Sequence, residues 1–141
     1  SEKVTKQFRI IFIGSLICAY GMLISFALQG YGLFSIFFST LSILLSFTFG
    51  GLYYKTTRSL ENTVSRKWFL AAIVFNIISA VGICYLSYMM ASKNYDQHLY
   101  LASVYWYLHF QYNGWFLFAV FGLIIHHLEI AKIYIKHEKI I

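Results

Sequence analysis

The chain has 141 residues, of which 60% are hydrophobic and 11% are charged, with a net charge of +6 and a mean hydropathy of +0.67. A soluble domain carries about 25% charged residues, so this composition indicates an integral membrane protein. The positive charge alone does not indicate nucleic-acid binding, which needs a basic patch on a soluble surface. We therefore expect a multi-pass protein of the cell membrane that contacts the lipid bilayer and no nucleic acid.

Four long apolar runs predict the fold. Each has at least the ~20 residues that a helix needs to cross ~30 Å of hydrocarbon, and none alternates every second residue as a barrel strand does. We expect an all-α integral membrane protein with four transmembrane helices in an antiparallel up-and-down bundle. Because the chain has no proline, the helices should be straight. The predicted single membrane domain covers 1–141, with helices at about 8–28, 31–54, 68–90 and 101–125 and a tail over 126–141.

The distribution of lysine and arginine predicts the orientation, since cytoplasmic loops carry the excess of these residues. The link between the first two runs has none, and the link between the last two has only Lys93. We therefore expect both termini in the cytoplasm and a short external loop that carries Asp96 and His98. The basic residues on the predicted cytoplasmic side are Lys3, Lys6, Arg9, Lys55, Arg58, Arg66, Lys67, Lys132, Lys136 and Lys139.

Small residues recur every three or four positions in the first two runs, which places them along one face of each helix. Such stripes let helix backbones approach closely in membranes, so we interpret them as packing surfaces. The alternative interpretation makes the serines a polar path for protons or a solute. In the third run we expect Asn76 either to bond across helices or to reach the same site as His109. The stripes are Gly14, Cys18, Gly21 and Ser25 in the first run, and Gly32, Ser35, Ser39, Ser42, Ser46 and Gly50 in the second.

The fourth run holds the candidate site, because His109 lies inside an otherwise apolar segment. An ionisable residue within a membrane span is a candidate functional residue by default, since hydrocarbon offers it no partner. His109 lies about 12 Å along a helix that starts near Leu101, in the outer half of the bilayer. Tyr105, Tyr112 and Asn113 share its helical face. Gln111 projects about 200° away and needs a different neighbour.

Two interpretations of this site stay open. In the first, His109, Tyr105 and Asn113 form hydrogen bonds between helices and hold a bundle together. In the second, His109 is an axial ligand to haem iron, because a neutral imidazole in a dry aromatic pocket suits that role. Tyr105, Tyr112 and Asn113 would then line the cofactor site. Near the end of the chain, His126 and Glu129 have the i, i+3 spacing of carboxylate-bridged metal sites, but a hydrated helix end is favoured because further acids are lacking.

The residues His109-Phe110-Gln111-Tyr112 resemble the His-Phe-His-Tyr motif in the tenth helix of the haem–copper oxidase catalytic subunit. The resemblance implies that His109 matches the ligand of the high-spin haem and that the four runs correspond to helices seven to ten. Gln111 stands where the family has the ligand of the low-spin haem. No histidine lies in the first three runs, so the family's copper ligands have no counterpart here. The resemblance therefore implies a divergent relative or fragment that binds one haem without copper, or a descendant without cofactors.

Three functions follow as expectations. The first is a haem-binding, respiratory-type membrane protein that resembles the oxidase subunit. The alternatives are a cofactor-free structural or assembly protein, and a segment of a transporter whose path is the serine stripe and Asn76. Whether the protein is an enzyme stays open. Because the chain begins with Ser1 rather than methionine, we expect it to be processed, trimmed or part of something larger, with other membrane helices or subunits as partners.

Overall fold

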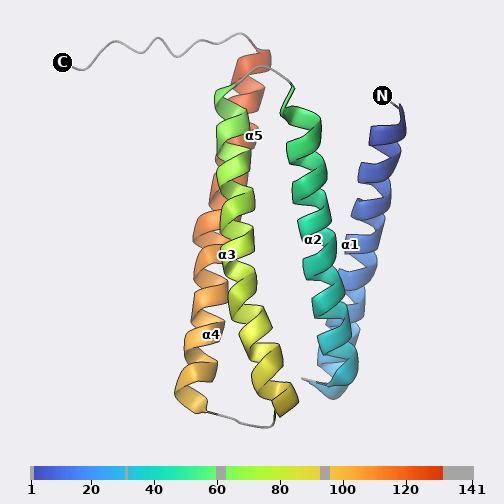
Figure 1. Cartoon of the computed structure of the whole chain (residues 1–141), viewed down its shortest axis with the longest axis vertical. Helices are drawn as coiled ribbons and strands as arrows, with labels where there is room; N and C mark the ends of the chain where they lie inside the picture. Colours follow the sequence, from blue (N-terminus) through green and yellow to red (C-terminus); the bar gives the residue numbers. More distant parts are fainter. Residues whose placement is uncertain (1, 31, 60–62, 93–95, 132–141) are drawn as a thin grey trace, which may run out of the picture.

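All of the regular structure in the described residues is helical (Figure 1). The computed structural model describes residues 2–30, 32–59, 63–92 and 96–131. The first three crossings are single helices, whereas the fourth is divided by a π-helical segment, η1. The elements are α1 (Glu2–Gln29), α2 (Leu33–Thr57), α3 (Val64–Ser92), α4 (Gln97–His109), η1 (Phe110–Phe116) and α5 (Leu117–Ile130).

Four helices are long and apolar enough to cross a membrane, with α4, η1 and α5 forming one continuous span over Gln97–Ile130. The predictions of an all-α fold and of four candidate spans are confirmed. Most helix ends lie beyond the predicted bounds: the first helix begins at Glu2 instead of residue 8, and the last continues to Ile130. The reason is that an apolar run marks only the part of a helix inside hydrocarbon, while polar residues continue the helix into the headgroup region. Most of the predicted tail, 132–141, lies outside the described residues.

α1 ends in a turn at Gly30. Gly30 has φ +62°, a left-handed conformation that a β-carbon disfavours, and its N–H donates to the carbonyl oxygen of Phe26 at 3.1 Å. Ser35 then fixes the start of α2, because its hydroxyl accepts from the N–H of Gly32 at 2.9 Å. The second helix consequently begins at Leu33, two residues later than predicted.

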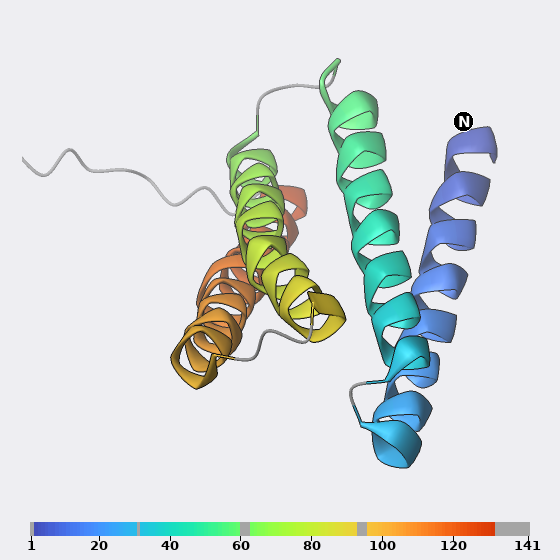
Figure 2. The same cartoon turned by 60° about the horizontal axis from the view of Figure 1, so that its bottom comes forward.

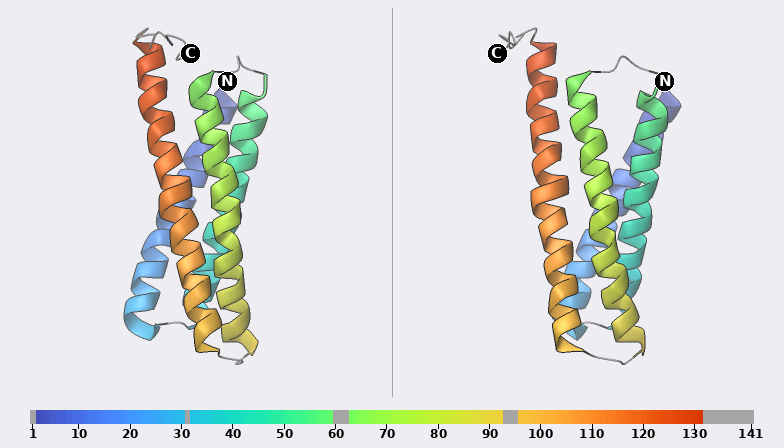
Figure 3. Two further views of the ribbon diagram at one scale, coloured as in Figure 1. Left: turned by 90° about the vertical axis from the view of Figure 1, so that its left-hand side faces the viewer. Right: turned by 60° about the vertical axis from the view of Figure 1, so that its left-hand side comes forward.

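The helices form two hairpins, which we call the first hairpin (α1 with α2) and the second hairpin (α3 with α4, η1 and α5). Successive crossings run in opposite directions (Figure 1). α1 packs against α2 alone among the described elements, and α2 against α3 is the only packing between the hairpins. Figure 2 shows α1 set apart from α4, and Figure 3 shows α1 inclined relative to the other helices. The chain is thus two hairpins joined along one helix pair rather than a bundle closed on all sides.

Close backbone packing holds the second hairpin together. A β-carbon at Gly82 of α3 would lie 2.7 Å from the carbonyl oxygen of Ser103 in α4, so only glycine fits. At the other end of the hairpin, Glu129 of α5 accepts the N–H groups of Val64 and Ser65 at 3.0 and 3.3 Å and the hydroxyl of Ser65 at 2.5 Å. Val64 and Ser65 are the first residues of α3, so their N–H groups have no acceptor within their own helix. Glu129 therefore acts as a helix cap.

The predicted packing stripes are confirmed in the first hairpin only in part. Cys18 is fully buried, and a β-carbon at Gly21 would lie 2.5 Å from the ring of Phe38, so this stripe of α1 packs against α2. In the α2 stripe, Ser39 contacts the sulfur of Met22, with 3.6 Å between Oγ and Sδ. The next serine of that stripe, Ser42, instead lines a cavity between the hairpins.

Replacing Gly82 with alanine tests the close contact in the second hairpin. Alanine is more favourable than glycine inside a helix by up to about 1 kcal/mol. At Gly82, however, its methyl group would meet a backbone oxygen that cannot move independently. We expect Gly82→Ala to lower the free energy of unfolding in detergent by about 1–3 kcal/mol. Gly51→Ala is the matched control, since a β-carbon there meets nothing within 4 Å. Equal stability of the two variants would contradict the packing.

Candidate functional site

The predicted motif coincides with the π-helical segment. η1 begins at Phe110, directly after His109, and the N–H of Leu117 donates to the carbonyl oxygen of Tyr112, five residues earlier. The fourth span is therefore not α-helical throughout although it lacks proline, because proline is not the only cause of an irregular helix. Segments of this kind are frequent at functional sites, since the wider turn changes which side chains share a face.

Gln111 faces the interior of the chain, opposite the residues predicted to form the site. Its side-chain oxygen lies 2.8 Å from the hydroxyl of Ser79 in α3, which donates to it or to the backbone oxygen of Asn76, also at 2.8 Å. The amide nitrogen of Asn76 donates to the hydroxyl of Ser46 in α2. We call Ser46, Asn76, Ser79 and Gln111 the inner polar layer. The separate neighbour expected for Gln111 is confirmed, and of the two alternatives for Asn76 the structure shows the bond across helices.

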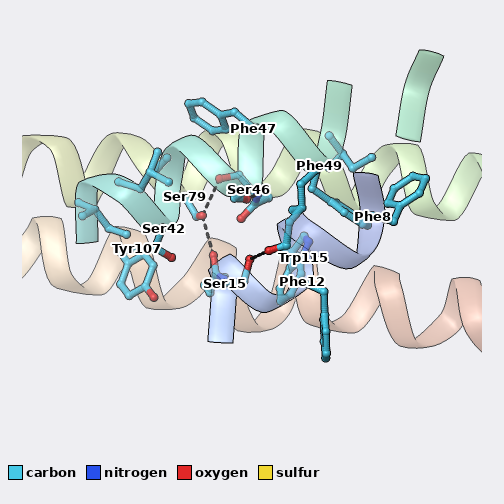
Figure 4. Close-up of a pocket in the computed structure, with 17 residues that line it drawn as sticks. Phe8, Phe12, Ser15, Ser42, Ser46, Phe47, Phe49, Ser79, Tyr107 and Trp115 are labelled. Atoms are coloured by element: carbon cyan, nitrogen blue, oxygen red, sulfur yellow. Dashed lines mark hydrogen bonds between the residues drawn. The ribbon is translucent and has the colours of Figure 1, made fainter. Parts of the chain in front are cut away.

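The inner polar layer borders a cavity of about 540 Å³ between the two hairpins, which we call the inner cavity (Figure 4). Further polar side chains at its wall are Ser15 of α1, Ser42 of α2 and Tyr107 of α4. Ser15 is about 20 Å from either end of α1, so the cavity lies near the middle of the spans. Its apolar wall includes Phe8, Phe12, Phe47, Phe49 and Trp115.

The four predicted site residues lie on the outside of the molecule. Tyr105 and Tyr112 are 73% and 60% exposed, and His109 and Asn113 are exposed as well. We call these four residues the outer polar face. Because the helix starts at Gln97, His109 is about 18 Å along it, deeper than the predicted 12 Å.

Contacts within the outer polar face stay inside one helix. The amide nitrogen of Asn113 lies 3.3 Å from Nδ1 of His109, and the ring of Tyr105 stacks on His109 with 6.1 Å between centroids. Tyr112 stacks on Phe116 at 6.0 Å. None of the four residues lines the inner cavity or the smaller cavity near Met22. Within the described residues, the cluster therefore does not bridge helices of this chain.

Sequence reasoning missed Ser15, Tyr107 and Trp115 as cavity residues. Ser15 falls outside the small-residue stripe of its helix, and its hydroxyl donates to the backbone oxygen of Ile11 at 2.9 Å. Tyr107 and Trp115 belong to an aromatic segment in which no periodicity distinguishes the inner from the outer face. The sequence contained one indication of an inner site. His109 and Gln111 point in different directions around the helix axis, so their side chains need partners in different places.

The chain was compared with protein-family models, curated proteins and solved structures, and none of them matches. The described residues also hold no group of three or more His, Cys, Asp or Glu side chains placed to bind a metal ion. The two polar surfaces of the fourth span are therefore the features of the chain that point to a function.

A double-mutant cycle tests the inner polar layer. Because Ser79 contacts Gln111 at 2.8 Å, Ser79→Ala and Gln111→Leu should be coupled by about 0.5–1.5 kcal/mol in the free energy of unfolding. Ser79→Ala combined with Asn113→Leu is the control cycle, since Asn113 faces outward, and should be additive within about 0.5 kcal/mol. Equal coupling energies in the two cycles, or no coupling in either cycle, would contradict the contact between Gln111 and Ser79.

Proposed function

We propose that the chain is a membrane-embedded subunit or segment of a larger assembly, and that its outer polar face docks against another membrane helix. This is a structural role that needs no cofactor. The observation that carries the proposal is the exposure of His109 and Asn113 near the middle of a span. Lipid offers these side chains no hydrogen bond, whereas a neighbouring helix does.

The hydrogen-bonding capacity of the outer polar face supports this role. Asn113 contacts only one of the two ring nitrogens of His109, and the hydroxyl groups of Tyr105 and Tyr112 make no hydrogen bond to a described residue. Side chains of this kind bond across helices in membranes, with about 0.5–2 kcal/mol per contact. Several contacts on one face would give a specific interface.

The orientation that we propose places both termini in the cytoplasm. The start of α1, the end of α2, the start of α3 and the end of α5 lie at the same end of the molecule (Figure 1). Described lysines and arginines gather at this end, at Lys3, Lys6, Arg9, Lys55, Arg58, Arg66 and Lys67. Lys93 lies outside the described residues. The excess supports a cytoplasmic position for the end with the termini.

Substitutions on the outer polar face test the docking role. After mild solubilisation of native membranes, the protein should migrate as a larger complex that Asn113→Leu or His109→Leu disrupts, whereas His109→Gln retains it because glutamine keeps a polar group of similar reach. Tyr88→Leu is the matched control, since Tyr88 is 65% exposed on α3. A complex that survives both leucine variants, or that Tyr88→Leu disrupts equally, would contradict docking through this face.

Haem binding by His109 is a second candidate function, and it depends on the docking proposal. The resemblance to the oxidase motif and the position of Asn113 beside Nδ1 favour it, because a ligand histidine usually has its second nitrogen held by a partner. If the amide of Asn113 is reversed, which is an equivalent assignment, its oxygen accepts from Nδ1–H and leaves Nε2 for iron. The residues fit one axial ligand with aromatic neighbours. Since His109 lines neither the inner cavity nor the smaller cavity near Met22, the partner helix would have to complete the enclosure.

The absorption spectrum of the intact assembly tests the haem proposal. We expect a Soret band that His109→Ala removes and that Gln111→Ala largely retains, because the two side chains lie on opposite faces and only the imidazole ligates iron. An intact but colourless assembly from haem-replete cells would contradict haem binding. That outcome would leave the docking proposal standing, so the two proposals fail separately.

A further inference from the structure

We propose that the inner cavity binds a neutral, lipid-soluble molecule that has a planar ring with carbonyl groups, of the quinone type. The cavity is distinct from the outer polar face, because no residue of that face lines it. Its volume of about 540 Å³ lies within the range of ~300–1,000 Å³ that is usual for small-molecule sites. Like such sites, it combines a mostly apolar wall with a few placed polar groups.

The polar groups of the cavity favour a ligand that carries hydrogen-bond acceptors. The hydroxyls of Ser42 and Tyr107 make no hydrogen bond to a described residue. The side-chain oxygen of Gln111 contacts Ser79, and its amide nitrogen likewise has no hydrogen-bond partner among the described residues. All three groups can donate. In Figure 4, Ser42 and Tyr107 lie on the same side of the cavity. Carbonyl oxygens of a ligand would satisfy these donors without any change in the inner polar layer.

The remaining walls select for a neutral ring. Phe8, Phe12, Phe49 and Trp115 present aromatic surface, against which a planar ring stacks favourably. No Asp, Glu, Lys, Arg or His occurs among the described residues that line the cavity. A charged ligand in the middle of the bilayer would need a counter-charge or a helix terminus there, so the lining argues against an ion or a charged solute.

The arrangement of the hairpins provides a route from the bilayer. The cavity wall includes residues of both α1 and η1, yet these two elements have no backbone packing against each other. Figure 2 shows the same separation between α1 and the fourth crossing. Because side chains alone separate the cavity from the bilayer between α1 and η1, we expect a lipid-soluble molecule to enter laterally on this side. A water-soluble ligand would gain nothing from such an entrance.

Trp115 supplies a local signal for binding, since quinones quench indole fluorescence and this residue lines the cavity. The experiment uses the full chain in lipid nanodiscs with Trp68→Phe and Trp106→Phe, so that Trp115 is the only tryptophan, and adds a benzoquinone with a ten-carbon tail. We expect saturable quenching. The control is a variant of the chain in which Trp106, outside the cavity, is the only tryptophan. Its fluorescence should show only the non-saturable quenching that quinone dissolved in lipid produces.

Variants then locate the site. Tyr107→Phe with Ser42→Ala should weaken saturable binding at least tenfold, and neither change disturbs the bond between Ser79 and Gln111. Tyr105→Phe with Asn113→Leu, on the outer polar face, should leave binding unchanged. Dodecane should not compete with the quinone. The inference is overturned by non-saturable quenching at Trp115, by inner variants that bind as tightly as the parent, by equal loss in the outer variant, or by full competition from dodecane.

Discussion

Hydrocarbon offers no hydrogen-bond partner, and this constraint determines how the polar residues of the chain are arranged. Near the middle of the spans, hydrogen bonds link Ser46, Asn76, Ser79 and Gln111 across three elements. The bond between Asn76 and Ser46 joins the second hairpin to the first, and among the described residues α2 against α3 is the only helix packing between the hairpins. The outer polar face lies on the same helical span as Gln111, and its contacts stay within that span. The protein therefore presents unsatisfied polar groups at the depth where they are least stable in lipid.

The two-sided character of the fourth crossing follows from its local structure. The π-helical segment begins directly after His109, so Gln111 lies in its first turn and faces Ser79. Gly114, within the same segment, is buried, and a β-carbon there would lie 2.7 Å from Phe75 of α3. Glycine thus lets η1 approach α3 closely while His109 and Asn113 remain outside. The same segment therefore contributes to both the inner cavity and the outer polar face.

The number of helices and the turn at Gly30 could be predicted from sequence, because both depend on local properties: the length of an apolar run and the conformational freedom of glycine. The opposite placement of Gln111 and His109 could be predicted from their spacing. The side that faces inward could not, since lipid is as apolar as a protein core and hydrophobicity does not separate them. The π-helical segment has no signal in composition. The cavity depends on Ser15, Tyr107 and Trp115, which come together only through the crossing of the hairpins.

The central claim is that the inner and outer surfaces of the fourth crossing differ in their contact with lipid. Spin labels attached singly at positions 109, 111 and 112, with Cys18 and Cys84 replaced by alanine, would measure this through their collision rate with oxygen, which concentrates in hydrocarbon. In the isolated chain in bilayers, we expect high accessibility at 109 and 112 and low accessibility at 111. In the native membrane, positions 109 and 112 should become protected. A label at 111 as accessible as one at 109 in the isolated chain would contradict the account.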